Sequence, residues 1–158
     1  MITRDLRVFY DGIIKGSPII AIDYGNRKTG IAISNHEHSF SIPLEIIENI
    51  SDHAKLDQIT SLLNKHSCGA IVIGLPIAMN GSTTEQTKIT LGFAAKLAKL
   101  TSCLIYLQDE RLTSRAANNL LKSFGIKRKA RNATDDSVAA NIILQDTLNS
   151  ISKLKLSS

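Results

Sequence analysis

The chain has 158 residues, the length of a single domain, and 43% of them are hydrophobic, enough to build a core. The formal net charge of +5 favours a polyanionic partner such as nucleic acid, while 4% aromatic residues and no tryptophan argue against a base-stacking surface. No apolar run reaches membrane-spanning length and no signal peptide is visible, so we expect a cytoplasmic protein without membrane attachment.

The N-terminal third of the sequence predicts strands. Residues 1–18 mix charges, glycines and a proline, and are expected to form a short arm in which residues 8–10 could add an edge strand. Short polar turns separate three apolar runs, and connections of this length favour antiparallel hairpins. The strands expected here are residues 19–23, 29–34 and 42–47.

After residue 51 the hydrophobic pattern alternates between helical periods and short buried strands. The expected elements are a helix from residue 51 or 52, a strand at 70–75, a helix with a capping box of Thr83 and Gln86, a strand at 104–107, a helix from Thr113 to Gly125, and a helix from Thr134 to about 151.

This order predicts an α/β fold of the ribonuclease H-like type: a five-stranded mixed sheet, with three antiparallel strands followed by two parallel strands, and helices on both faces. We expect residues 19–152 to form one domain and residues 153–158 to form a flexible tail.

Acidic residues stand at three comparable places. Asp23 ends the first long strand, Asp109 and Glu110 follow the strand at 104–107, and Asp135 and Asp136 open the last helix. Each could be an ordinary turn residue, a solvated strand end or a helix cap. However, a carboxylate beside a buried strand is costly unless it is paired, hydrogen-bonded or bound to metal. If these acids meet at one sheet edge, they provide hard oxygen ligands for divalent metal ions.

Basic residues lie close to the same segments. A basic run before the last predicted helix is either a solvated charge run or a set of phosphate contacts. The candidate phosphate-binding residues are Arg27, Lys28, Arg111, Arg115, Lys127, Arg128, Lys129 and Arg131.

Histidine and cysteine offer little further chemistry. Cys68 and Cys103 have neither CxxC nor zinc-site spacing, and each precedes a predicted strand, so we expect reduced neighbours. His36 and His38 fall in a hairpin turn and are interpreted as solvated residues.

Four segments carry a more specific pattern: residues 22–34 around Asp-Tyr-Gly, 73–86 from Ile-Gly-Leu-Pro, 109–114 with Asp-Glu-Arg-Leu-Thr-Ser, and 136–145 from Asp-Ser-Val-Ala-Ala. In order and spacing they resemble the motifs of the YqgF/RuvX family of pre-16S rRNA nucleases, which are also described as Holliday-junction-resolvase-like. The resemblance runs from about residue 19 to 148. The segment before residue 19 and the Asn-Arg-Lys sequence at 26–28 depart from the family's usual pattern.

The resemblance implies a hydrolase that cuts phosphodiester bonds with two Mg²⁺ or Mn²⁺ ions. Carried over by position, the catalytic and metal-binding acids are Asp23, Glu110 and Asp136. The implied task is maturation of the 5' end of pre-16S ribosomal RNA in ribosome biogenesis. The implied partner is nucleic acid, either precursor rRNA or branched DNA, bound by a monomer or weak homodimer.

Three other functions share some of these sequence features. A Holliday junction resolvase-like endonuclease acting on branched DNA would use the same acids, and a non-catalytic nucleic-acid-binding module would need only the basic surface. An actin- or sugar-kinase-like nucleotide binder shares the fold core but needs a second domain, for which the chain is too short.

Overall fold

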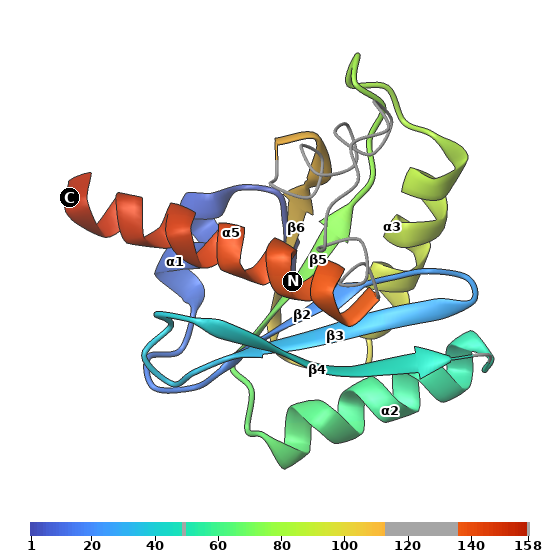
Figure 1. The fold of residues 1–158 in the computed structure, drawn as a ribbon, viewed down its shortest axis with the longest axis horizontal. Helices are drawn as coiled ribbons and strands as arrows, with labels where there is room; N and C mark the ends of the chain where they lie inside the picture. The colour runs from blue at the N-terminus through green and yellow to red at the C-terminus, as the bar shows by residue number, and fades with distance from the viewer. Residues whose placement is uncertain (49, 113–135, 158) are drawn as a thin grey trace, which may run out of the picture.

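The structure, a computed structural model, describes residues 1–48, 50–112 and 136–157. Over these ranges a mixed sheet carries helices on both faces (Figure 1). Its strands are β1 (Ile2–Thr3), β2 (Ile19–Asp23), β3 (Lys28–Ser34), β4 (Ser41–Glu48), β5 (Ala70–Leu75) and β6 (Leu104–Asp109). The helices are α1 (Leu6–Gly12), α2 (Asp52–Lys65), α3 (Glu85–Ala98) and α5 (Asp136–Ser157), with a 3₁₀ turn, η1 (Glu110–Leu112).

The sheet follows the strand order β1-β6-β5-β2-β3-β4. The pairs β2–β3 and β3–β4 are antiparallel, whereas β2–β5, β5–β6 and β1–β6 are parallel. The predicted mixed α/β fold is therefore confirmed. The predicted number of five strands is wrong, because the described sheet has six. The additional strand β1 is two residues long, too short to produce a hydrophobic pattern in the sequence.

The first 18 residues pack on the domain. Residues 8–10, considered above as an edge strand, lie instead in α1, whose N-cap Asp5 accepts hydrogen bonds from the backbone of Arg7 and Val8. Phe9 is fully buried, and its ring stacks on Tyr106 with the centroids 5.1 Å apart. The predicted arm thus contributes one strand and one helix to the fold.

Two hydrophobic clusters lie on opposite faces of the sheet. One joins β2 and β5 to α2 and α3, and it contains Ile20, Ile22 and Ile73. The other joins the alternate residues of the same strands, such as Ala21 and Val72, to α1 and α5. Figure 1 shows α5 crossing the sheet on the face opposite to α2. The short, continuously apolar strands β2 and β5 are covered on both sides, as their sequence predicts.

Some boundaries differ from those expected. The capping box of α3 uses Thr84 and Thr87, one residue beyond the predicted Thr83 and Gln86. Helix α5 continues to Ser157, through most of the segment expected as a tail. The helix predicted from Thr113 to Gly125 lies outside the described residues. Among the described helices, none combines the length and apolar character that crossing a membrane requires.

Candidate active site

Asp23 is the last residue of β2 and lies at the carboxyl end of the strand. It is 7% exposed. Side chains alternate along a strand, so Asp23 shares the face of Ile19 and Ala21, which pack in the cluster with α5. The parallel register pairs Ile22 with Ile73, and the next residue of β5 is Gly74. Asp23 therefore stands level with Gly74, on a neighbouring strand roughly 5 Å away.

Glu110 reaches the same place from the other side. It follows β6 directly and opens the turn η1. A Cβ atom built on Gly74 would lie 3.2 Å from the Glu110 carboxyl carbon and 2.6 Å from Ile143 Cδ1. The Glu110 carboxylate thus lies directly over Gly74, and any side chain at position 74 would displace it. A glycine here leaves room for a carboxylate between the sheet and α5.

Asp136 is the first residue of α5, and its side chain lies outside the described part of the structure. Position 136 falls on the same helical stripe as Ala140 and Ile143, which are both fully buried against the sheet. It precedes Ile143 by two turns, about 10 Å along the helix axis. The structure thus places Glu110 over Gly74, sets Asp23 level with Gly74 on the neighbouring strand, and starts α5 with Asp136 on the same face of the sheet.

Asp109 has a different environment from its neighbour. Its carboxylate accepts hydrogen bonds from Arg111 Nη2 at 2.7 Å, Arg111 Nε at 3.1 Å and the Arg111 backbone N–H at 3.0 Å. These hydrogen bonds hold the pKa of Asp109 below its ordinary value. Arg111 Nη1 also donates to the carbonyl of Met79 at 3.4 Å, which ties the loop after β5 to η1. The Asp109 carboxylate is therefore engaged in an ion pair with Arg111.

The predicted phosphate-binding residues are only partly described. Arg27 and Lys28 lie at the β2–β3 turn, and both are exposed. Lys28 Nζ lies 3.9 Å from Glu48, so part of its charge is balanced. Arg111 is occupied by Asp109 and Met79 as described above. The remaining candidates lie outside the described residues: Arg115, Lys127, Arg128, Lys129 and Arg131.

The histidines and cysteines make local contacts. His36 Nδ1 and His38 Nε2 donate to the carbonyls of Gly16 at 2.8 Å and Ser17 at 2.6 Å, so these rings fasten the β3–β4 turn to the segment before β2. Cys103 Sγ donates to the carbonyl of Cys68 at 3.5 Å, and burial raises the pKa of the Cys68 thiol to about 11. Both cysteines are free. Among the side chains that the structure describes, which do not include that of Asp136, no three of His, Cys, Asp or Glu converge as a metal site.

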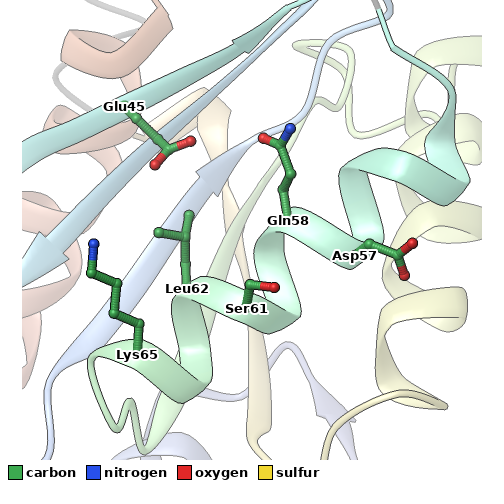
Figure 2. A pocket seen from close by; sticks show the side chains of 6 residues that line it. All are labelled: Glu45, Asp57, Gln58, Ser61, Leu62 and Lys65. Carbon is green, nitrogen blue, oxygen red and sulfur yellow. The ribbon is translucent and has the colours of Figure 1, made fainter.

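An open pocket of about 310 Å³ lies between β4 and α2, on the sheet face opposite to α5 (Figure 2). Glu45 comes from β4, and the other lining residues come from α2. Acidic and basic side chains and one leucine line this pocket. The sheet separates the pocket from Asp23 and Glu110. We assign it no role.

Sequence reasoning missed a group of buried residues next to the candidate site. Tyr24 and Lys55 are both buried. The Tyr24 hydroxyl donates to Asp52 at the start of α2, and Lys55 donates to the Gly25 carbonyl in the β2–β3 turn. The sequence presents Tyr24 only as part of the Asp-Tyr-Gly motif, and residue type alone does not single out Lys55, because a lysine in a helix is ordinarily solvated. The one sequence feature that indicates burial of Lys55 is its position beside Leu56 and one turn before Ile59, on the apolar side of the helix.

A mixed sheet of this strand order, with acids at the carboxyl ends of its strands and a helix across them, defines the ribonuclease H-like class. The RuvX family, described as Holliday junction resolvase, matches residues 17–150. Proteins of Rickettsia conorii and Rickettsia bellii, both named "Putative pre-16S rRNA nuclease", are each 51% identical over 154 residues, which is 98% of this chain and 100% of theirs. The chain belongs to the RuvX family.

Solved structures support the fold. RuvC of Thermus thermophilus bound to a Holliday junction aligns with a TM-score of 0.56 and 11% identity, covering 87% of this chain and 96% of that one. A second structure of RuvC from the same organism aligns with a TM-score of 0.50 and 12% identity, covering 86% and 96%. At such low identity, the likeness establishes a shared fold.

Proposed function

We propose that this chain is a divalent-metal-dependent nuclease that hydrolyses phosphodiester bonds in the maturation of the 5' end of pre-16S ribosomal RNA. Family membership supports the nuclease activity, and the names of the full-length relatives support the RNA substrate. The single observation that carries the proposal is the Glu110 carboxylate over the side-chain-free surface of Gly74, level with buried Asp23 at the end of the neighbouring strand.

The residues fit a pair of Mg²⁺ or Mn²⁺ ions. Carboxylate oxygens are the protein ligands that these hard cations prefer, and Mg²⁺ retains several waters of its own. Asp23, Glu110 and Asp136 would hold the ions at the carboxyl ends of β2 and β6 and the start of α5. Bound ions of this kind activate a water and stabilise the charge on the leaving oxygen.

The neighbouring residues would orient this site and its substrate. Arg111 holds Asp109 in an ion pair, whereas the Glu110 carboxylate lies over Gly74. Arg27 and Lys28 present positive charge on the turn that follows Asp23, where flanking phosphates would bind. The basic residues near 127–131 would add sequence-independent affinity for the nucleic-acid backbone.

We further propose that the protein acts in the cytoplasm, as a monomer or weak homodimer, with nucleic acid as its principal partner. A second candidate function is cleavage of branched DNA. The family description and the fold shared with RuvC favour this alternative. A resolvase cuts two strands symmetrically and so requires a dimer.

One experiment separates these functions. Purified protein is incubated with Mn²⁺ and either a 5'-labelled RNA that spans the 5' end of 16S rRNA and its leader, or a labelled four-way DNA junction. We expect cleavage of the RNA by the wild type and none by Asp23→Asn. Preferential cutting of the junction would favour the resolvase. Tight binding of both substrates without any cleavage would show a non-catalytic binding module.

A further inference from the structure

Lys55 is a buried lysine on the face of α2 that packs against the sheet, with 1% of its side chain exposed. Its Nζ atom donates to the carbonyl oxygens of Gly25 at 2.8 Å and Asn26 at 3.3 Å. The same atom lies 3.8 Å from Asp52 Oδ1 and 4.9 Å from the centre of the Tyr24 ring. An ammonium group is unfavourable in a protein interior unless such partners replace its water.

Both carbonyl acceptors belong to one short turn. The β2–β3 turn comprises residues 24–27, between Asp23 at the end of β2 and Lys28 at the start of β3 (Figure 1). It is tight, because a side chain at position 25 would meet the carbonyl of Lys28. Thr29 Oγ1 also donates to the Gly25 carbonyl at 3.2 Å. Lys55 therefore fastens the first turn of α2 to the segment that directly follows Asp23.

Tyr24 holds the same segment from the same side of the sheet. Its ring stacks on Phe93 of α3, with the centroids 4.3 Å apart, and its hydroxyl donates to the two Asp52 oxygens at 2.9 and 3.0 Å. Because side chains alternate along the strand, Tyr24 points to α2 and α3 while Asp23 points to the α5 face. Contacts on one face of the sheet thus fix the end of β2 from which Asp23 emerges on the other.

We infer that Lys55 is a positioning residue for the candidate active site: it fixes the β2–β3 turn and thereby holds the Asp23 carboxylate at the end of β2, on the sheet face where Glu110 lies over Gly74. The inference rests on the nuclease function proposed above. Asp23 is the last residue of its strand, where the ladder alone constrains the backbone least. A metal site needs its ligands held within a fraction of an ångström.

The alternative is that Lys55 contributes only to folding stability. The positioning role and the stabilising role differ in whether loss of Lys55 changes metal affinity or only the melting temperature. Loss of a stabilising residue lowers the melting temperature but leaves the affinity of the folded protein for metal unchanged. Loss of a positioning residue weakens metal binding in protein that is still folded.

The decisive variant is Lys55→Met, which keeps an unbranched apolar chain one heavy atom shorter than lysine and removes the donor. The matched control is Leu63→Ala, on the same helix, which removes core packing two turns beyond Lys55 without touching the turn. Three quantities are measured for each: the Mn²⁺ dissociation constant, from the electron paramagnetic resonance signal of free Mn²⁺; the deuterium exchange of residues 24–29; and kcat for the labelled RNA.

We expect Lys55→Met to weaken Mn²⁺ binding by about tenfold or more, as loss of an outer-shell partner typically does. Exchange in the turn should accelerate, and kcat should fall by about 100-fold, the effect of displacing a reacting group by roughly 1 Å. Leu63→Ala should lower the melting temperature and leave Mn²⁺ affinity and exchange in the turn at the wild-type level.

Wild-type Mn²⁺ affinity and wild-type exchange in folded Lys55→Met would overturn the inference. If this variant does not fold, Lys55→Gln replaces it, because its amide keeps a polar group at this position but is one atom too short to reproduce the bonds to the Gly25 and Asn26 carbonyls. Weaker Mn²⁺ binding in Lys55→Gln would support the inference, and unchanged binding would overturn it. If the wild type neither binds Mn²⁺ nor cleaves, the proposed function fails, and the exchange rates alone still decide whether Lys55 fixes the turn.

Discussion

Two adjacent acids, Asp109 and Glu110, have opposite surroundings. Four hydrogen bonds, from three N–H groups of Arg111, satisfy the carboxylate of Asp109, and they also favour its charged form. Glu110 begins a 3₁₀ turn, which swings its carboxylate back over Gly74. The change from strand to turn between the two residues therefore decides which acid belongs to the candidate site.

The acids themselves supply the first prediction. Asp23→Asn and Glu110→Gln each remove a charged oxygen ligand, so kcat for the labelled RNA in Mn²⁺ should fall by more than the roughly 10–100-fold that loss of an outer-shell partner causes. Asp109→Asn should have a milder effect, because that carboxylate is bound to Arg111. If Asp109→Asn lost more activity than Glu110→Gln, the assignment of the two neighbours would have to be reversed.

Tyr24 supplies a prediction about alkaline pH. Burial, together with the hydrogen bond to Asp52, raises the pKa of Tyr24 from 10.0 to about 12. Because the folded state favours the protonated hydroxyl, this group's stabilisation is fully present below pH 10 and is lost as pH rises towards 12. Urea unfolding should find Tyr24→Phe less stable than the wild type at pH 9, by about 0.5–1.5 kcal/mol.

The difference between the two proteins should shrink between pH 10 and pH 12. Both proteins contain the remaining tyrosines and lysines, so the titration of those groups largely cancels in the difference. A gap that is independent of pH across this interval would show that the Tyr24 hydroxyl titrates normally.

At the scale of elements, the N-terminal segment is the part that sequence reasoning described least well. A hydrogen bond from the backbone of Ile105 to the carbonyl of Met1 continues the pairing of β1 with β6. Helix α1 then turns Phe9 inward, where it contributes to the cluster on the α5 face. The segment thus covers an edge of the sheet that would otherwise be open to pairing with other chains.

The contribution of α1 is measurable through Phe9→Ala. Because Phe9 is fully buried and stacked on Tyr106, this substitution should lower the free energy of unfolding by about 3–5 kcal/mol. Val8→Ala is the matched control, since Val8 is 38% exposed on the same helix, and it should change stability little. Equal stability of the two variants would mean that residues 1–18 behave as a detached arm.

Strands β2 and β5 could be predicted to the residue, because a short continuous apolar run bounded by turn residues is typical of a buried strand. Helix α1 could not, since seven residues are too few for a helical period to become visible. The contacts of Lys55 could not be predicted either, because they depend on α2 packing beneath a distant turn. The roles of Asp23, Glu110 and Asp136 stay predictions from the sequence motifs.

The basic segment supplies a prediction from charge alone, as residues 127–131 lie outside the described part of the structure. Replacing Lys127, Arg128, Lys129 and Arg131 by alanine should weaken RNA binding and reduce its dependence on salt. Each lost phosphate contact should lower the slope of log affinity against log salt concentration by roughly 0.7–0.9. Mn²⁺ affinity should not change. A salt slope equal to that of the wild type would identify the run as a solvated surface.

At the scale of the whole molecule, the proposed site would trade stability of the metal-free protein for activity. The chain carries a net charge of +5, and in the proposed site the acids at one end of its sheet would repel one another when no cation is bound. Such a site would lower the stability of the empty protein and be retained for its activity. Cation binding would remove the repulsion and stabilise only the folded state, which would couple metal binding to folding.

This coupling yields a prediction for Asp136→Asn, measured by thermal melts with and without Mn²⁺. Without metal, the variant should be as stable as the wild type or more stable by up to about 1–2 kcal/mol, because one repelling charge is gone. Mn²⁺ should raise the melting temperature of the wild type, and raise that of the variant less, because a ligand has been lost. Asp146→Asn, on the same helix ten residues further along, is the control and should respond to Mn²⁺ like the wild type. If Asp136→Asn instead destabilised the metal-free protein strongly, and Mn²⁺ shifted both proteins equally, Asp136 would act at the start of α5 through the helix dipole alone, and the ions would have to be held by Asp23 and Glu110 without it.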